Sequence, residues 1–230
     1  MSPADVGEGL PGPLALVGGD EWRPGCTFDA ELWEGAGRPE VLVLPTAAAF
    51  EHPQRAADFA CRWFATFGAS VTPVMVISRE DARDPHWVEM GGAGKFLYLG
   101  GGSPLHLRSV LKDSPMWDAL VKAWRAGAVL AGSSAGAMVL GDPMVDPRGG
   151  ALTVGLGLIT KMAVLPHYDT WSEEKARRTV SLATGHLRIA AIEERTALIR
   201  DPDGKWRTAG AGTVTVFVDG RPAPLDALPS

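Results

Sequence analysis

Six short apolar runs, each continuous rather than alternating with polar residues, constrain the fold of this chain more than any other feature. Strands buried on both faces have such continuous runs, whereas strands with one face in water alternate. Helical spacing appears between the runs, near residues 53–67, after Pro104, over about 115–126 and after Thr170 or Ser172. This order predicts an α/β fold, with a mostly parallel sheet sandwiched by helices. The runs are Leu14–Val17, Val41–Leu44, Val71–Ile77, Phe96–Leu99, Ala128–Ala131 and Met162–Leu165.

The last quarter of the chain has a different pattern. Thr196–Ile199 is followed by Asp201-Pro-Asp-Gly204 and a further strand-like stretch from Trp206, and Thr213–Val218 is followed by Asp219-Gly220. Turn residues between strand-forming segments indicate antiparallel hairpins. We therefore expect a small antiparallel extension at one edge of the parallel sheet. The 230 residues form a single domain in this interpretation, with loose tails over about 1–12 and 223–230.

Composition excludes several classes of function. The net charge is −5 and there is no basic block, which argues against nucleic acid as a partner. No apolar run reaches the roughly 18 residues of a membrane span, and the N-terminus lacks the parts of a signal peptide, so we expect no membrane partner and a cytoplasmic location. Cys26 and Cys61 form neither a disulfide framework nor a metal motif, so we expect no metal and no cofactor. A homodimer is the one protein assembly that we consider.

The most informative segment is Gly132-Ser-Ser134-Ala-Gly136, which directly follows an apolar strand. The pattern Gly-x-Ser-x-Gly is typical of a nucleophile elbow, in which the serine lies on a sharp strand-to-helix turn and the glycines let neighbouring chains pass closely. The alternative is a Gly/Ser-rich loop that binds phosphate or has no function. The strand before the segment and the helix-compatible residues after it favour Ser134 as a nucleophile.

His167 is the candidate for the base that such a serine needs. It follows the run Met162–Leu165 and Pro166, so we expect it at the carboxyl end of a strand. Ligands bind at that edge in open α/β sheets, and the elbow serine emerges at the same edge. The other histidines have structural explanations, since they lie beside prolines, on a helix or in a turn; they are His52, His86, His106 and His186.

Three glycines follow the run Phe96–Leu99 and give the third element of the site. Such a loop exposes backbone amides, and an oxyanion hole needs amides aimed at the tetrahedral intermediate. We expect Gly101 or Gly102 to supply one amide and Ala135, the residue after the nucleophile, to supply the other. The spacing differs from dinucleotide-binding and P-loop patterns. Gly18-Gly-Asp-Glu21 after the first run is either a second wall of the cleft or a simple turn.

Taken in order, these segments resemble the serine peptidase family that contains dipeptidase E (aspartyl dipeptidase) and cyanophycinase. The resemblance covers about residues 13–218. It implies a fold similar to that of class I glutamine amidotransferases, with serine in place of their cysteine. The segments that carry it are Gly18-Gly19, Leu44-Pro-Thr-Ala47, Gly100–Ser103, Gly132–Ala137, Gly155–Leu158, Pro166-His-Tyr168 and Ile192–Ala197.

The resemblance implies that Ser134 is the nucleophile and His167 the base, and it offers two places for the acid that orients the histidine. Glu194 matches one of them, and Asp142 or Asp146 matches the other, soon after the serine. The order Ser…Asp…His favours the aspartates. Glu194, however, follows an apolar strand and can also reach the sheet edge. We prefer Glu194 and keep the two aspartates as alternatives.

The segment after His167 departs from the family's pattern. Family members that act on aspartyl substrates tend to carry basic or amide residues there, whereas this chain carries Asp169, Glu173 and Glu174. A substrate carboxylate beside three acids is poorly matched unless Arg177 and Arg178 reach back. This departure argues against a preference for aspartyl substrates or cyanophycin and leaves the hydrolytic residues in place.

We therefore expect a serine hydrolase, most simply a peptidase of the dipeptidase E and cyanophycinase type. It would cleave a small peptide or amide through an acyl-enzyme on Ser134. One alternative is an amidotransferase-like hydrolase of another amide or an ester. Another is a non-catalytic binding module in which the elbow is a relic.

Overall fold

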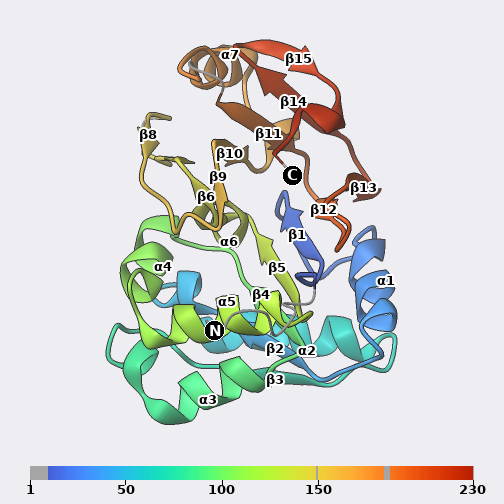
Figure 1. Ribbon diagram of the computed structural model, residues 1–230, viewed down its shortest axis with the longest axis vertical. Helices are drawn as coiled ribbons and strands as arrows, with labels where there is room; N and C mark the ends of the chain where they lie inside the picture. The colour runs from blue at the N-terminus through green and yellow to red at the C-terminus, as the bar shows by residue number, and fades with distance from the viewer. Residues whose placement is uncertain (1–9, 149, 184–186, 230) are drawn as a thin grey trace, which may run out of the picture.

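The computed structural model describes residues 10–148, 150–183 and 187–229. Most of its strands form two main sheets, and the helices pack around these sheets (Figure 1). The larger sheet has seven strands. Its central part, from β1 to β3, is parallel, and β12 and β13 add an antiparallel hairpin at one edge. The spatial order is β13 (Trp206–Gly210), β12 (Thr196–Arg200), β1 (Leu14–Val17), β5 (Val129–Ser133), β4 (Phe96–Leu99), β2 (Val41–Leu44) and β3 (Val71–Pro73).

A second, six-stranded sheet lies above the first in Figure 1. Its central strands β10 and β11 are parallel, and β14 and β15 extend it as antiparallel strands. The order is β15 (Arg221–Ala223), β14 (Val214–Val218), β11 (Arg188–Ile192), β10 (Met162–Leu165), β6 (Gly141–Asp142) and β9 (Ile159–Thr160). β7 (Met144–Val145) and β8 (Leu152–Thr153) form a separate ribbon.

Helices cover both faces of the larger sheet, as the continuous apolar runs require. Alternate residues of each strand point to opposite faces, so Val43 packs with α1 and α2 and Leu44 packs with α4 and α5. α6 packs against both β5 and β10 and so joins the two sheets. The helices are α1 (Thr27–Gly35), α2 (Pro53–Ala65), α3 (Pro85–Ala93), α4 (Pro104–Leu111), α5 (Pro115–Arg125), α6 (Ala135–Leu140) and α7 (Glu173–Ser181). Single 3-10 turns span Thr46–Ala48, Asp81–Arg83, Tyr168–Thr170 and Leu225–Ala227.

The fold class is confirmed, and three details of the expectation are wrong. Met162–Leu165 does not join the main sheet but pairs with β11 in the second one. The antiparallel extension is divided, because β12 and β13 edge the first sheet while β14 and β15 edge the second. Sheet strand Val71–Pro73 is shorter than the run that predicts it. Continuous apolar runs cannot show which sheet a strand joins, since β10 and β11 of the second sheet are buried much as β1, β4 and β5 of the first are.

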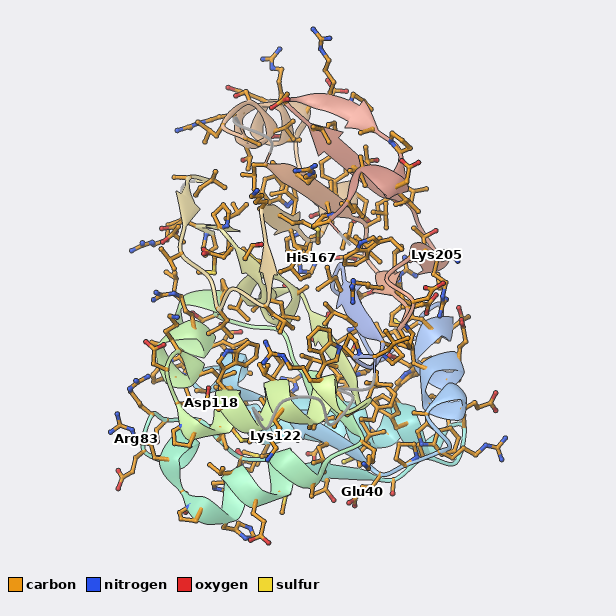
Figure 2. The ribbon with its side chains drawn as sticks, viewed as in Figure 1. Glu40, Arg83, Asp118, Lys122, His167 and Lys205 are labelled. Atoms are coloured by element: carbon orange, nitrogen blue, oxygen red, sulfur yellow. The ribbon has the colours of Figure 1, made fainter. Side chains whose placement is uncertain are left out.

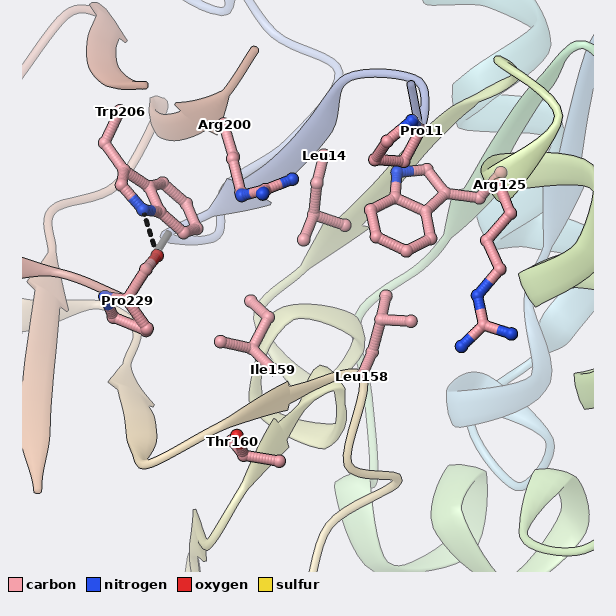
Figure 3. A pocket seen from close by; sticks show the side chains of 10 residues that line it. Pro11, Leu14, Arg125, Leu158, Ile159, Thr160, Arg200, Trp206 and Pro229 are labelled. Atoms are coloured by element: carbon pink, nitrogen blue, oxygen red, sulfur yellow. Dashed lines mark hydrogen bonds between the residues drawn. The ribbon is translucent and has the colours of Figure 1, made fainter. Parts of the chain in front are cut away.

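The expected loose tails are also wrong where the structure describes them. Gly12 is buried and exchanges hydrogen bonds with Trp124, its amide donating to the carbonyl at 2.8 Å and its carbonyl accepting from the indole at 2.8 Å. At the other end, the Trp206 indole donates to the Pro229 carbonyl at 2.7 Å, beside a cavity of about 390 Å³ (Figure 3). Residues 1–9, 230 and His186 lie outside the described residues. No helix among the described residues is long and apolar enough to cross a membrane.

One acid is buried in the core between α1, α2 and the main sheet. Asp29 is fully buried and accepts a hydrogen bond from the Trp63 indole at 2.8 Å through one carboxylate oxygen. Burial, with a smaller contribution from the nearby charge of Glu21, raises the pKa of Asp29 well above its usual range. The native protein therefore holds a proton that the unfolded chain releases above about pH 4.

This proton makes stability depend on pH. Because the native pKa is raised, the stabilisation is fully present below the unfolded pKa and is lost as pH rises towards the native value, with a slope of up to about 1.4 kcal/mol per pH unit. Asp29→Asn cannot ionise, so its free energy of unfolding should fall less steeply with pH. Urea titrations between about pH 5 and about pH 7 measure the slopes. The exposed Asp118→Asn on α5 is the control, and equal slopes for Asp29→Asn and the parent protein would contradict this assignment.

Candidate active site

Ser134 occupies the sharp turn between β5 and α6, as the elbow pattern predicts. Its φ is 49° and its ψ is −108°, a conformation that non-glycine residues rarely adopt. A Cβ on Gly132 would lie 2.6 Å from the backbone of Gly136, and one on Gly136 would overlap the carbonyl of Leu99. Both glycines of the pattern are therefore needed for close backbone approach.

His167 lies directly beside Ser134. It follows β10 in the left-handed region, with φ of 54°, and its Nε2 is 2.9 Å from the Ser134 Oγ. Figure 2 labels His167 near the middle of the view, where the two sheets meet. Its side chain keeps 35% of its surface exposed, so a substrate can reach the pair. A serine of the first sheet and a histidine of the second sheet thus meet at the junction of the two.

Glu194 completes the row from the far side of the imidazole. Its Oε1 is 2.8 Å from His167 Nδ1, the nitrogen that faces away from Ser134. An ionised carboxylate can only accept a hydrogen bond, so the tautomer that fits has the proton on Nδ1, which donates a hydrogen bond to Glu194. Nε2 is then free to accept the Ser134 hydroxyl proton. The Glu194 amide donates to Asp169 Oδ1 at 3.0 Å, which holds the segment after β11 in place.

Backbone carbonyls at the end of β1 hold the three segments together. Three consecutive carbonyls accept hydrogen bonds: that of Val17 from the Ser134 amide at 2.9 Å, that of Gly18 from the His167 amide at 2.7 Å, and that of Gly19 from the Arg195 amide at 2.8 Å. Gly18-Gly19 is therefore more than a simple turn, because its carbonyls bind two segments of the site, whereas neither glycine lines the cavity beside Ser134. One strand end sets the positions of the serine, the histidine and the residue after Glu194.

The expected oxyanion donors differ in their surroundings. Ala135 is the first residue of α6, so its amide is one of those that have no acceptor within the helix. Gly102 lines a cavity together with Ser134 and His167. The amide of Gly101, in contrast, donates to Glu21 Oε1 at 3.0 Å. In this structure the Gly101 amide is thus already bound to a carboxylate, and the assignment of Gly102 and Ala135 as the oxyanion donors stays a prediction.

Glu21 is the site residue that the sequence did not single out. Its second oxygen accepts from the Ser133 hydroxyl at 2.8 Å, so one carboxylate joins the end of β5 to the loop after β4. Both of these segments border Ser134. A lone acid after a glycine turn carries no sequence signal for this role.

Neither alternative acid contacts His167. Asp142 lies in β6, where its Oδ1 accepts from the Gly155 amide at 3.2 Å. Asp146 forms a two-pronged pair with Arg148, with distances of 3.0 and 2.6 Å. The structure thus brings Glu194, and neither aspartate, to the imidazole. No group of three or more potential metal ligands occurs among the described residues. Burial raises the pKa of the Cys26 thiol to about 12, so this thiol is uncharged at neutral pH.

Comparison with known proteins identifies the family of this chain. Residues 28–205 match the sequence model of Peptidase family S51. The chain belongs to this peptidase family. It is 29% identical over 196 residues to a cyanophycinase of Nostoc sp. and 26% identical over 223 residues to a cyanophycinase of Geminocystis herdmanii. These matches cover 79% and 90% of this chain but 64% and 80% of the relatives, so the chain spans less than two thirds of the Nostoc protein.

Solved structures of peptidases share the fold. A peptidase from an acI-B1 Actinobacterium superimposes with a TM-score of 0.83 at 28% identity, covering 94% of both chains. A protein assigned to peptidase E from Listeria monocytogenes superimposes with a TM-score of 0.63 at 16% identity, covering 90% of this chain and 98% of that one. The second likeness concerns the fold alone. Membership of the family and the α/β fold expected from the sequence are both confirmed.

Gly19 offers a test of how closely the imidazole is fitted to the end of β1. A Cβ at Gly19 would overlap the His167 ring, coming 2.6 Å from Nε2. Gly19→Ala should therefore displace the ring from Ser134 and lower kcat by about 10²-fold or more, as a misplacement of about 1 Å can do. Hydrolysis rates and unfolding midpoints measure the two effects separately.

Gly37→Ala is the matched control, because Gly37 also has a positive φ, of 82°, and a Cβ there meets nothing within 4 Å. Gly37→Ala should lower the free energy of unfolding by about 1 kcal/mol because of backbone strain, and it should keep the parent protein's hydrolysis rate. Full activity of Gly19→Ala would contradict the close fit.

Proposed function

We propose that this protein is a serine peptidase that cleaves a small peptide or amide through an acyl-enzyme on Ser134. The observation that carries the proposal is the row of side chains in which Ser134 Oγ is 2.9 Å from one nitrogen of His167 and Glu194 is 2.8 Å from the other. Both distances lie within hydrogen-bond reach, as nucleophile activation by a base requires.

The first half of the proposed reaction forms the acyl-enzyme. His167 Nε2 takes the proton of Ser134 as Oγ attacks the substrate carbonyl, and the imidazole becomes positively charged. Glu194 accepts the Nδ1 proton in a hydrogen bond and stabilises that charge without taking the proton itself. The amides of Ala135 and Gly102 would bind the oxygen of the tetrahedral intermediate. The charged imidazole then gives its proton to the leaving amine.

The second half releases the product. A water molecule takes the place of the leaving amine, and His167 removes a proton from it as its oxygen attacks the acyl carbon. A second tetrahedral intermediate collapses, Ser134 recovers its proton from the imidazole, and the free acid leaves. Ser134, His167, the leaving amine and one water molecule account for every proton transfer in the two halves of the proposed reaction.

Covalent labelling tests the nucleophile. A fluorophosphonate should attach to Ser134, located by mass spectrometry of the digested protein, and Ser134→Ala should remove both the adduct and the hydrolysis of dipeptides. The exposed Ser109→Ala on α4 is the control and should label like the parent protein. An adduct at any other residue, or no adduct, would contradict the proposal. Labelling together with hydrolysis of esters but of no peptide would instead favour a different hydrolase.

The orienting acid is tested by Glu194→Gln. The amide cannot accept the Nδ1 proton as a carboxylate does, and loss of the orienting acid in a serine protease lowers kcat by about 10⁴-fold. We expect a loss of kcat of this order with an unchanged unfolding midpoint, measured on the same dipeptide. Asp142→Asn keeps an oxygen for the Gly155 amide and should cost much less. The reverse ranking would transfer the role to the aspartate.

A further inference from the structure

A small cavity opens directly beside Ser134 and His167. Its volume is about 190 Å³, below the range of about 300–1,000 Å³ of sites that hold whole ligands. This size suits a single side chain of a substrate whose carbonyl lies at Ser134. The cavity reaches from Gly102 to the ribbon of β7 and the turn that follows it.

The walls of the cavity are mostly apolar. Met138 comes from α6, Val145 comes from β7, and Trp171 precedes α7. Met138 and Val145 keep only 6% and 1% of their surface exposed, so they present fixed apolar surface to a substrate. Three prolines complete the lining and offer no amide donor; they are Pro104, Pro147 and Pro166.

The charge of the cavity opposes an acidic side chain. Asp146 lies in the wall with 17% of its side chain exposed, and its pair with Arg148 lowers its pKa to about 2, so it is ionised at neutral pH. Among the described residues that line the cavity there is no lysine or arginine. A substrate carboxylate would lose its water here and lie near the carboxylate of Asp146, and the lining offers it no cation, because Arg148 lies outside the lining and is already paired with Asp146.

The two arginines that could balance a substrate carboxylate, Arg177 and Arg178, lie outside this cavity. Arg177 lines a separate hollow with Tyr168 and Phe217, and Arg178 is exposed on α7. Neither belongs to the described lining of the cavity beside Ser134. The departure from the family pattern after His167 therefore has a structural counterpart.

We infer that this cavity binds the side chain on the acyl side of the scissile bond, and that it selects a compact apolar side chain, such as leucine or methionine, over aspartate. The inference rests on the proposed function, because it places the acyl carbon at Ser134. Burial of apolar surface favours binding of such a side chain, and an unbalanced carboxylate opposes it.

Phosphonate analogues that differ only in their side chain test this preference. Diphenyl phosphonates of leucine, methionine, aspartate and arginine all react through the same serine, and their second-order rates of inactivation report the fit of each side chain. We expect the leucine and methionine probes to react about tenfold or more faster than the aspartate probe. Faster reaction of the aspartate or arginine probe would overturn the inference. So would a lack of reaction with all four while a fluorophosphonate still labels Ser134. Failure of the fluorophosphonate as well would refute the proposed function itself.

Asp146→Asn tests the source of the discrimination. The substitution removes the like charge and releases Arg148, which then has no carboxylate partner in this turn. The ratio of the leucine rate to the aspartate rate should fall by about tenfold. Asp203→Asn is the matched control, since Asp203 forms the same kind of short-range pair with Lys205 in an exposed turn. An unchanged ratio in Asp146→Asn would overturn the electrostatic part of the inference.

Discussion

Three successive carbonyls at the end of β1 organise the site, because each accepts a backbone amide from a different part of the chain. Val17 binds Ser134, Gly18 binds His167 and Gly19 binds Arg195, all at 2.9 Å or less. The three donors, Ser134, His167 and Arg195, belong to segments that follow β5, β10 and β11, so no local element could place them together. Strand β1 itself is buried and paired on both sides, which makes its end a rigid reference point.

Glycine is required at this reference point for steric reasons. A Cβ on Gly18 would overlap the Glu193 carbonyl, and one on Gly19 would overlap the imidazole. Glu21, two residues further on, accepts from both Ser133 and Gly101 and so fixes the two loops on either side of the serine. In the segment Gly18–Glu21, Gly18 thus binds the segment with His167 and Gly19 binds the segment after Glu194. Glu21 binds the end of β5 and the loop after β4.

Much of this arrangement could be predicted from the sequence, and the exceptions have physical reasons. Continuous apolar runs mark strands such as β1 and β5, and strand-end position identifies Ser134 and His167. Glu194 was one of three candidates, because sequence order alone cannot tell which acid folds back onto the ring. Helix α3 was missed since its sequence contains Gly91-Gly92, which disfavour helices. The second sheet was missed because the runs that form β10 and β11 look like those of the first.

The division of the site between two sheets also orders its assembly in time. A ribosome releases the serine elbow well before the segments that carry His167 and Glu194. β1 lacks its neighbour β12 until synthesis has passed Glu194, because β12 begins two residues after Glu194. A nascent chain that stops short of β10 therefore carries Ser134 without the base and the acid that the proposed reaction needs. The three side chains can meet only after the segment that carries Glu194 has been made and has folded back onto the end of β1.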